Sequence, residues 1–174
     1  PNLNLIADFD AAYNAPFCST VGSSCSSGFL LDGKASNVEP NPSNTIDGCA
    51  DGSTGSYHSD ESVDKITISS VDGTKLKMGG LATIETNVWA WNTGSADTAD
   101  FYHAADATAN SITWTYLGSI NAGGGSERIL SRENFQLSYS PVQAVRVRFR
   151  YNGSSAPCNN GRYDDVDDLV FAVA

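Results

Sequence analysis

The sequence predicts an all-β protein, folded as an antiparallel β-sandwich of jelly-roll type. Three observations predict this fold class. The chain lacks the apolar periodicity of an amphipathic helix. Turn-forming Gly, Ser, Asn and Asp residues recur at short intervals, as they do between the strands of sandwiches. Several stretches alternate apolar and polar residues with a period of two, which gives each of them one face to bury.

The expected strands follow one another along the whole chain. Leu3, Leu5 and Ile6 make an apolar strand candidate at its start. The later candidates are rich in β-branched or aromatic residues and are bounded by turn residues. In chain order they are residues 66–68, 81–91, 101–104, 112–120, 142–151 and 169–173.

Four cysteines predict disulfides in a secreted, extracellular protein. Several pairings are open, and four free thiols are the alternative. We favour Cys18 with Cys25, which closes a compact local loop, and Cys49 with Cys158, which makes a long-range link. By loop-closure entropy the long link would stabilise the fold by about 4–5 kcal/mol, and the short one by less.

Length and charge limit the classes of protein and partner. The 174 residues contain no linker-like segment, so one domain covering 1–174 is expected. A formal net charge of −10 argues against nucleic acid, whose phosphates need a basic surface. No apolar run approaches the ~18 residues of a membrane span. The chain begins at Pro1 without a leader, so we expect a processed protein or a piece of a larger secreted one.

An acidic run stands directly before the last strand candidate, and two more aspartates follow the apolar start. Four carboxylates in five positions repel one another and weaken a strand unless a cation neutralises them. Calcium is the natural cation, because it accepts six to eight oxygen ligands in flexible geometry. A solvated acidic turn is the alternative. The predicted calcium site, which would join the two ends of the chain, has the ligands Asp8, Asp10, Asp164, Asp165, Asp167 and Asp168.

Two loop segments are further candidates for ligands. Residues 32–62 hold many turn residues and few strand formers, and so long a loop is usually functional or ordered by a ligand or cross-link. Cys49 and the acids around it could supply both. Near its end, Asp60 and Glu61 could hold a second metal ion, with a plain polar loop as the alternative; the spacing does not match an EF-hand.

Aromatic residues suggest a binding surface. Trp89 and Trp91 share one face of residues 81–91, and with Tyr102 and Trp114 nearby they could form a platform for sugar rings. The alternative is that both indoles belong to the sandwich core. The opposite face carries Ile84, Val88 and Ala90, and its small groups, such as Thr86 and Ala90, favour a core position for the indoles.

Residues 142–151 place three arginines on one strand face. Arg146, Arg148 and Arg150 could bind an acidic polysaccharide or a peptide carboxylate, because the guanidinium fork suits bidentate contact. The alternative, in so acidic a chain, is pairing with carboxylates on neighbouring strands. The other face of this strand, which is expected to be buried, carries Val145, Val147 and Phe149.

Catalytic signatures are absent. His58 and His103 are the two histidines, and the sequence contains no G-x-S-x-G, H-E-x-x-H or reactive-cysteine pattern. We therefore expect no intrinsic catalysis. A small jelly-roll polysaccharide hydrolase or lyase remains the alternative, because two carboxyl groups across a cleft cannot be recognised from sequence.

Two resemblances point to a family. Asp8-Phe9-Asp10 together with Asp167-Asp168-Leu169 resembles the bracket of calcium-stabilised carbohydrate-binding and MAM-type jelly rolls. Most of the chain is similar to the C-terminal accessory modules of secreted bacterial proteases. The segments that carry the second resemblance are residues 44–52 (NTIDGCADG), 57–62 (YHSDES), 88–91 (VWAW), 143–147 (QAVRV) and 167–171 (DDLVF).

These resemblances imply a non-catalytic β-sandwich appended to an exported hydrolase. Its expected function is to bind polysaccharide, cell surface or protein substrate and direct the parent catalytic domain there. A domain that aids folding or secretion of a parent protease is the alternative.

Overall fold

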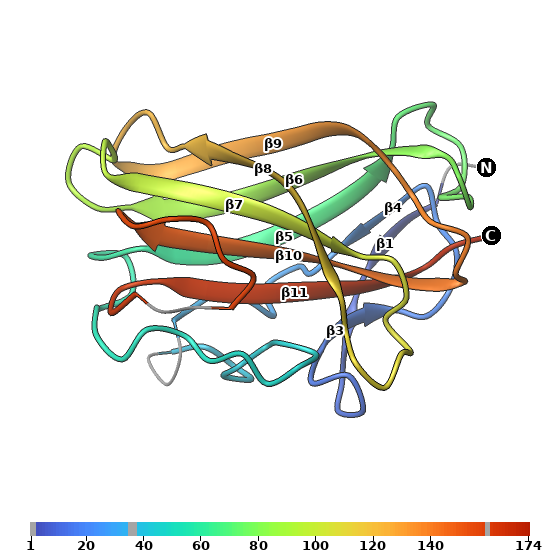
Figure 1. The fold of residues 1–174 in the computed structure, drawn as a ribbon, viewed down its shortest axis with the longest axis horizontal. Helices are drawn as coiled ribbons and strands as arrows, with labels where there is room; N and C mark the ends of the chain where they lie inside the picture. The colour runs from blue at the N-terminus through green and yellow to red at the C-terminus, as the bar shows by residue number, and fades with distance from the viewer. Residues whose placement is uncertain (1–2, 35–37, 159–160) are drawn as a thin grey trace.

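The fold is described from a computed structural model, which covers residues 3–34, 38–158 and 161–174. Part of the predicted long loop, residues 35–37, lies outside this description. Figure 1 shows an all-β molecule of two packed sheets, which confirms the predicted β-sandwich. The strands are β1 (Asn4–Ile6), β2 (Asp8–Asp10), β3 (Ala15–Cys18), β4 (Ser24–Ser26), β5 (Ser62–Ser70), β6 (Leu81–Ala90), β7 (Asp97–Ala104), β8 (Trp114–Asn121), β9 (Ser126–Gln136), β10 (Val142–Tyr151) and β11 (Asp165–Ala172).

The sheets are mixed rather than purely antiparallel. One has the strand order β1-β4-β5-β6-β9 and the other β2-β3-β11-β10-β7-β8. Most neighbours are antiparallel, but β1 pairs with β4 and β3 pairs with β11 in parallel. The prediction of an antiparallel sandwich is therefore wrong at these two pairs, where the short N-terminal strands join each sheet.

The core lies between the sheets and follows the predicted alternation. Val145, Val147 and Phe149 of β10 are fully buried, as are Ile84 and Val88 of β6. The buried positions of β10 confirm its predicted inward face, whereas β6 buries the face opposite Trp89. Within the described residues, no helix is long and apolar enough to cross a lipid bilayer.

The sequence pattern does not predict the edge strand β9. Its side chains are largely exposed, and Leu130 and Phe135 are the two that reach the core. So sparse an apolar pattern is typical of edge strands and is hard to tell from a polar loop. The short strands β2, β3 and β4 were missed for a related reason, because three or four residues are too few to show alternation.

Both favoured disulfides are present. Cys18–Cys25 links β3 to β4, and so ties one sheet to the other across a sequence separation of 7 residues. Cys49–Cys158 spans 109 residues and fastens the long loop to the segment after β10. Their Cα–Cα distances of 6.1 and 5.5 Å lie in the range that a disulfide requires.

Candidate metal centre

The alternation of β11 separates the aspartates that the sequence groups together. Side chains of a strand point to opposite faces in turn. Asp165 and Asp167 therefore share the face of Leu169 and Phe171, which belong to the core between the sheets. Asp168 points to the other, outer face. Since all three aspartates are at most 1% exposed, each needs a partner that water cannot supply.

On the outer face, arginines of the neighbouring strand β10 neutralise the acids. Arg146 makes a two-point ion pair with Asp168, at 2.7 and 2.9 Å. Arg148 does the same with Asp164, just before β11, at 3.0 and 2.6 Å. Asp164 and Asp168 are thus held by guanidinium groups, which corrects their prediction as metal ligands.

The arginine stripe is a buried structural network rather than a ligand surface. Arg150 pairs with Asp100 of β7 at 2.7 Å. Arg146 also reaches Asp47 at 2.6 Å and lies 4.2 Å from the centre of the Trp114 ring. All three arginines are at most 9% exposed, so the alternative of pairing across strands is the one that the structure bears out.

On the inner face, β11 meets the long loop at an acidic cluster. One carboxylate oxygen each from Glu39, Asp51 and Asp165 lie within 4.8 Å of one another. Asp51 also accepts a hydrogen bond from the backbone N–H of Val166 at 2.9 Å. Asp167 is close enough that these three carboxylates raise its pKa. The cluster of Glu39, Asp51, Asp165 and Asp167 is called the inner acidic cluster below.

The inner acidic cluster contains oxygen atoms that nothing in the described chain satisfies. Neither carboxylate oxygen of Asp167 accepts a hydrogen bond there, and Oδ1 of Asp165 also accepts none. The side-chain oxygen of Asn44, whose amide group donates to Glu39, is buried without a donor as well. Buried oxygens in this state are costly, and a bound cation is one way to satisfy them.

The electrostatics of the cluster also favour a cation. Burial raises the pKa of Asp165 well above its ordinary value, and the charge of Asp51 adds to the effect. Burial likewise raises the pKa of Asp167, with the largest charge contribution from Asp165. The nearby cation is Lys34, whose ammonium group is buried and donates to the backbone carbonyls of Glu61 and Asp164, both at 3.1 Å. One ammonium group against four carboxylates leaves room for a divalent ion.

The long loop reaches the cluster because backbone hydrogen bonds fix it along β11. Asp168 N–H donates to the carbonyl of Asn44 at 2.9 Å, and Gly52 N–H donates to the carbonyl of Asp164 at 2.8 Å. Cys49 lies between these two anchors and holds its disulfide to Cys158. In Figure 1 the loop runs beside the outer edge of β11.

The N-terminal aspartates do not join the cluster. Asp8 and Asp10 lie in β2, opposite Phe17 and Ala15 of β3, so that a whole strand separates them from β11. Asp10 instead accepts hydrogen bonds from the next backbone turn, including one of 2.8 Å from Ala12. The predicted link between the two ends of the chain is therefore wrong in its N-terminal half.

The predicted aromatic platform is not formed. Trp89 stacks on His58 with ring centres 4.4 Å apart, whereas Trp91 packs edge-on against Tyr151 at 5.8 Å. Tyr102 is buried and lies in the other sheet. The alternative of two core indoles is not found either, because Trp91 is 42% exposed.

The second predicted metal position contains a buried acid pair. Glu61 is 1% exposed and interacts with the carboxyl group of Asp97, which is also buried. Burial raises the pKa of Glu61 to about 8, and the neighbouring Asp97 adds to this. Asp60 is partly exposed and accepts a hydrogen bond from Ser56 N–H at 2.8 Å. The pair is arranged to share a proton.

This acid pair gives a pH dependence of stability. A carboxyl group whose pKa is higher in the folded than in the unfolded chain favours folding only while protonated. Stability is therefore greatest below the ordinary value of 4.5 and falls as pH rises toward about 8. We expect a loss on the order of 1–3 kcal/mol over this window, measured by urea unfolding in excess calcium. Glu61→Gln should flatten the profile, and an unchanged slope in that variant would contradict the assignment.

Comparison with known proteins leaves the family open. No protein-family model matches the chain, and no curated protein matches its sequence. The molecule is thus defined by its architecture: a two-sheet β-sandwich with two disulfides and an acidic cluster between a long loop and the last strand.

Proposed function

We propose that the chain is a calcium-stabilised, non-catalytic binding module of a secreted enzyme. It would direct a parent catalytic domain to polysaccharide, cell-surface or protein substrate outside the cell. The observation that carries this proposal is the inner acidic cluster, in which Glu39, the partly buried Asp51 and Asp165 bring carboxylate oxygens within 4.8 Å of one another, with the buried Asp167 on the same face of β11 as Asp165.

Calcium is the ion that this donor set fits best. The cluster offers carboxylate oxygens and the amide oxygen of Asn44, with no thiolate or imidazole in the set. Zinc in structural sites is usually bound through Cys and His, whereas calcium takes many oxygens in flexible geometry. Magnesium demands near-octahedral geometry and keeps several waters, which suits a closed, carboxylate-rich interior poorly.

The position of the cluster supports an architectural role for the ion. Glu39 and Asp51 come from the long loop, while Asp165 and Asp167 come from β11. An ion between them would fasten the loop to the sandwich, alongside the Cys49–Cys158 disulfide. The two disulfides also fit an oxidising, extracellular environment.

The surroundings of His103 support a non-catalytic module. Burial lowers the pKa of His103, whose ring is hydrogen-bonded to Gln143 at 2.8 Å. His58 bonds to Asp64 at 2.8 Å and stacks against Trp89. The buried ring of His103 is poorly placed to exchange protons with a polymer, whereas the side chain of His58 is 41% exposed.

The proposal is tested by retention on polymers. The chain, fused to a fluorescent protein, is passed over cellulose, chitin and immobilised collagen in calcium and in excess chelator, with the fluorescent protein alone as control. We expect retention on at least one polymer in calcium and release by the chelator, because the ion orders the long loop. A folded, calcium-loaded chain that is retained on none of them, or that releases soluble sugars or peptides, contradicts the proposal.

A further inference from the structure

A pocket lies between the ends of the two sheets, and its lining contains none of the acids of the inner cluster. Its volume is about 200 Å³, and five side chains line it. Trp91 follows β6 in one sheet, Tyr151 ends β10 in the other, and Tyr163 precedes β11. Asp60 and Glu61 complete the lining from the segment that leads into β5.

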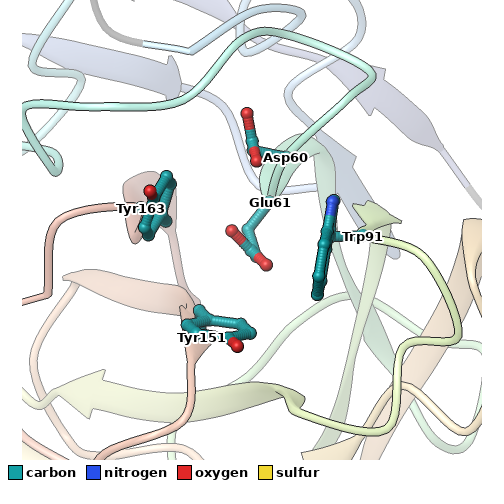
Figure 2. A pocket seen from close by; sticks show the side chains of 5 residues that line it. All are labelled: Asp60, Glu61, Trp91, Tyr151 and Tyr163. Atoms are coloured by element: carbon teal, nitrogen blue, oxygen red, sulfur yellow. The ribbon is translucent and has the colours of Figure 1, made fainter.

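The three aromatic rings form the walls of a box. Trp91 and Tyr151 meet edge to face, with ring centres 5.8 Å apart and planes at 86°. Tyr151 and Tyr163 meet in the same way, at 6.0 Å and 77°. Figure 2 shows Trp91 and Tyr163 on opposite sides of the pocket, with Tyr151 closing a third side. Aromatic rings that stand perpendicular to one another can surround a compact group. A flat sugar ring, in contrast, stacks better on rings that are parallel to it.

The floor and rim of the box are acidic. Glu61 points into the space between the rings, with Asp60 at one edge (Figure 2). Glu61 is 1% exposed, and the buried Asp97 lies against it. The positive charge that faces Glu61 is Lys34, which directs its ammonium group to backbone carbonyls, including that of Glu61 at 3.1 Å. Asp60 and the buried Glu61–Asp97 pair make the lining acidic, and a cation placed there would favour the ionised form of the pair.

We propose that this pocket binds an organic ammonium group, such as a methylated or quaternary amine. Aromatic faces attract cations through their quadrupole, most strongly where water is excluded, and aromatic boxes are a recurrent way of holding quaternary ammonium. The carboxyl group of Glu61 lies at the bottom of the box, where a bound ammonium group would favour its ionised form. The inference rests on the proposed function in one respect, because it names a ligand chemistry for a binding module.

The test compares a cation with a neutral molecule of the same shape. Choline and 3,3-dimethylbutan-1-ol differ chiefly in the replacement of the quaternary nitrogen by carbon. Isothermal titration of each into the calcium-loaded chain should show choline binding at least tenfold more tightly. Equal affinity for the two, or no binding of choline by the folded chain, would overturn the proposal. Binding of cellobiose in place of choline would assign the pocket to carbohydrate instead.

Two variants locate the site. Trp91→Ala should weaken choline binding at least tenfold, and Glu61→Gln should weaken it while keeping the shape of the pocket. Trp89→Ala is the matched control, because that indole stacks on His58 outside the pocket and its loss should leave choline affinity unchanged. Thermal melting of each variant verifies that it is folded. Calcium-dependent polymer retention without choline binding would refute this inference alone, and leave the proposed function standing.

Discussion

Asp167→Asn is expected to change stability in opposite directions with and without calcium. In excess chelator the variant should be more stable than the parent chain by on the order of 1 kcal/mol, because it removes a buried carboxyl group whose pKa the cluster raises. In calcium it should be less stable, because a ligand is lost. An ion at a hundred times its Kd stabilises the folded state by about 2.7 kcal/mol, and most of this should disappear. Urea unfolding in the two conditions measures both effects.

Asp168→Asn provides the control for this experiment. Asp168 is adjacent in sequence and equally buried, but it points to the outer face and pairs with Arg146. Its replacement should destabilise the chain in both conditions by breaking that ion pair. If calcium stabilised the Asp167 variant as much as the parent chain, Asp167 would not be a ligand.

Arg146→Leu is expected to be the most destabilising change in the outer ion-pair network. The guanidinium group is fully buried between Asp168 and Asp47, and its removal leaves the wholly buried Asp168 without its cation. Breaking a buried pair on one side costs about 3–5 kcal/mol. The loss should appear as a lower urea midpoint at neutral pH.

Two controls separate charge from volume in this prediction. The double variant Arg146→Leu with Asp168→Leu should recover part of the loss, because replacing a whole buried pair by apolar groups is often nearly neutral. Lys77→Ala removes an exposed ion pair with Asp72, the two side chains being 54% and 49% exposed, and should cost little because solvent screens exposed pairs. If Arg146→Leu lowered the free energy of unfolding as little as Lys77→Ala does, the outer ion-pair network would contribute little to stability.

The sequence was informative where strand alternation applies. The inward face of β10, with Val145, Val147 and Phe149, follows from a period of two, and the structure buries all three. The same rule, applied to β11, separates Asp165 and Asp167 from Asp168. The density of the aspartates suggests a single site, but it does not show that arginines of the neighbouring strand face Asp164 and Asp168.

The loop members of the inner acidic cluster could not be predicted from local pattern. Glu39 and Asp51 lie in a loop without periodicity, and hydrogen bonds to β11 and the Cys49–Cys158 disulfide bring them to Asp165. The length of the loop indicated that something orders it, but not which of its acids turn inward. The sequence groups Asp8 and Asp10 with the aspartates near the end of the chain because both segments are acidic. In the fold, β3 lies between β2, which carries Asp8 and Asp10, and β11.

Calcium titration into chelator-stripped protein tests the inner acidic cluster most directly. Isothermal titration should show binding of about one ion per chain, and the melting temperature should rise. For a chain of this size a stabilisation of about 2.7 kcal/mol corresponds to roughly 5–10 °C. Asp167→Asn should lose both the heat of binding and the rise. If the parent chain gave no heat of binding and the same melting temperature in calcium as in excess chelator, the inner acidic cluster would not be a calcium site.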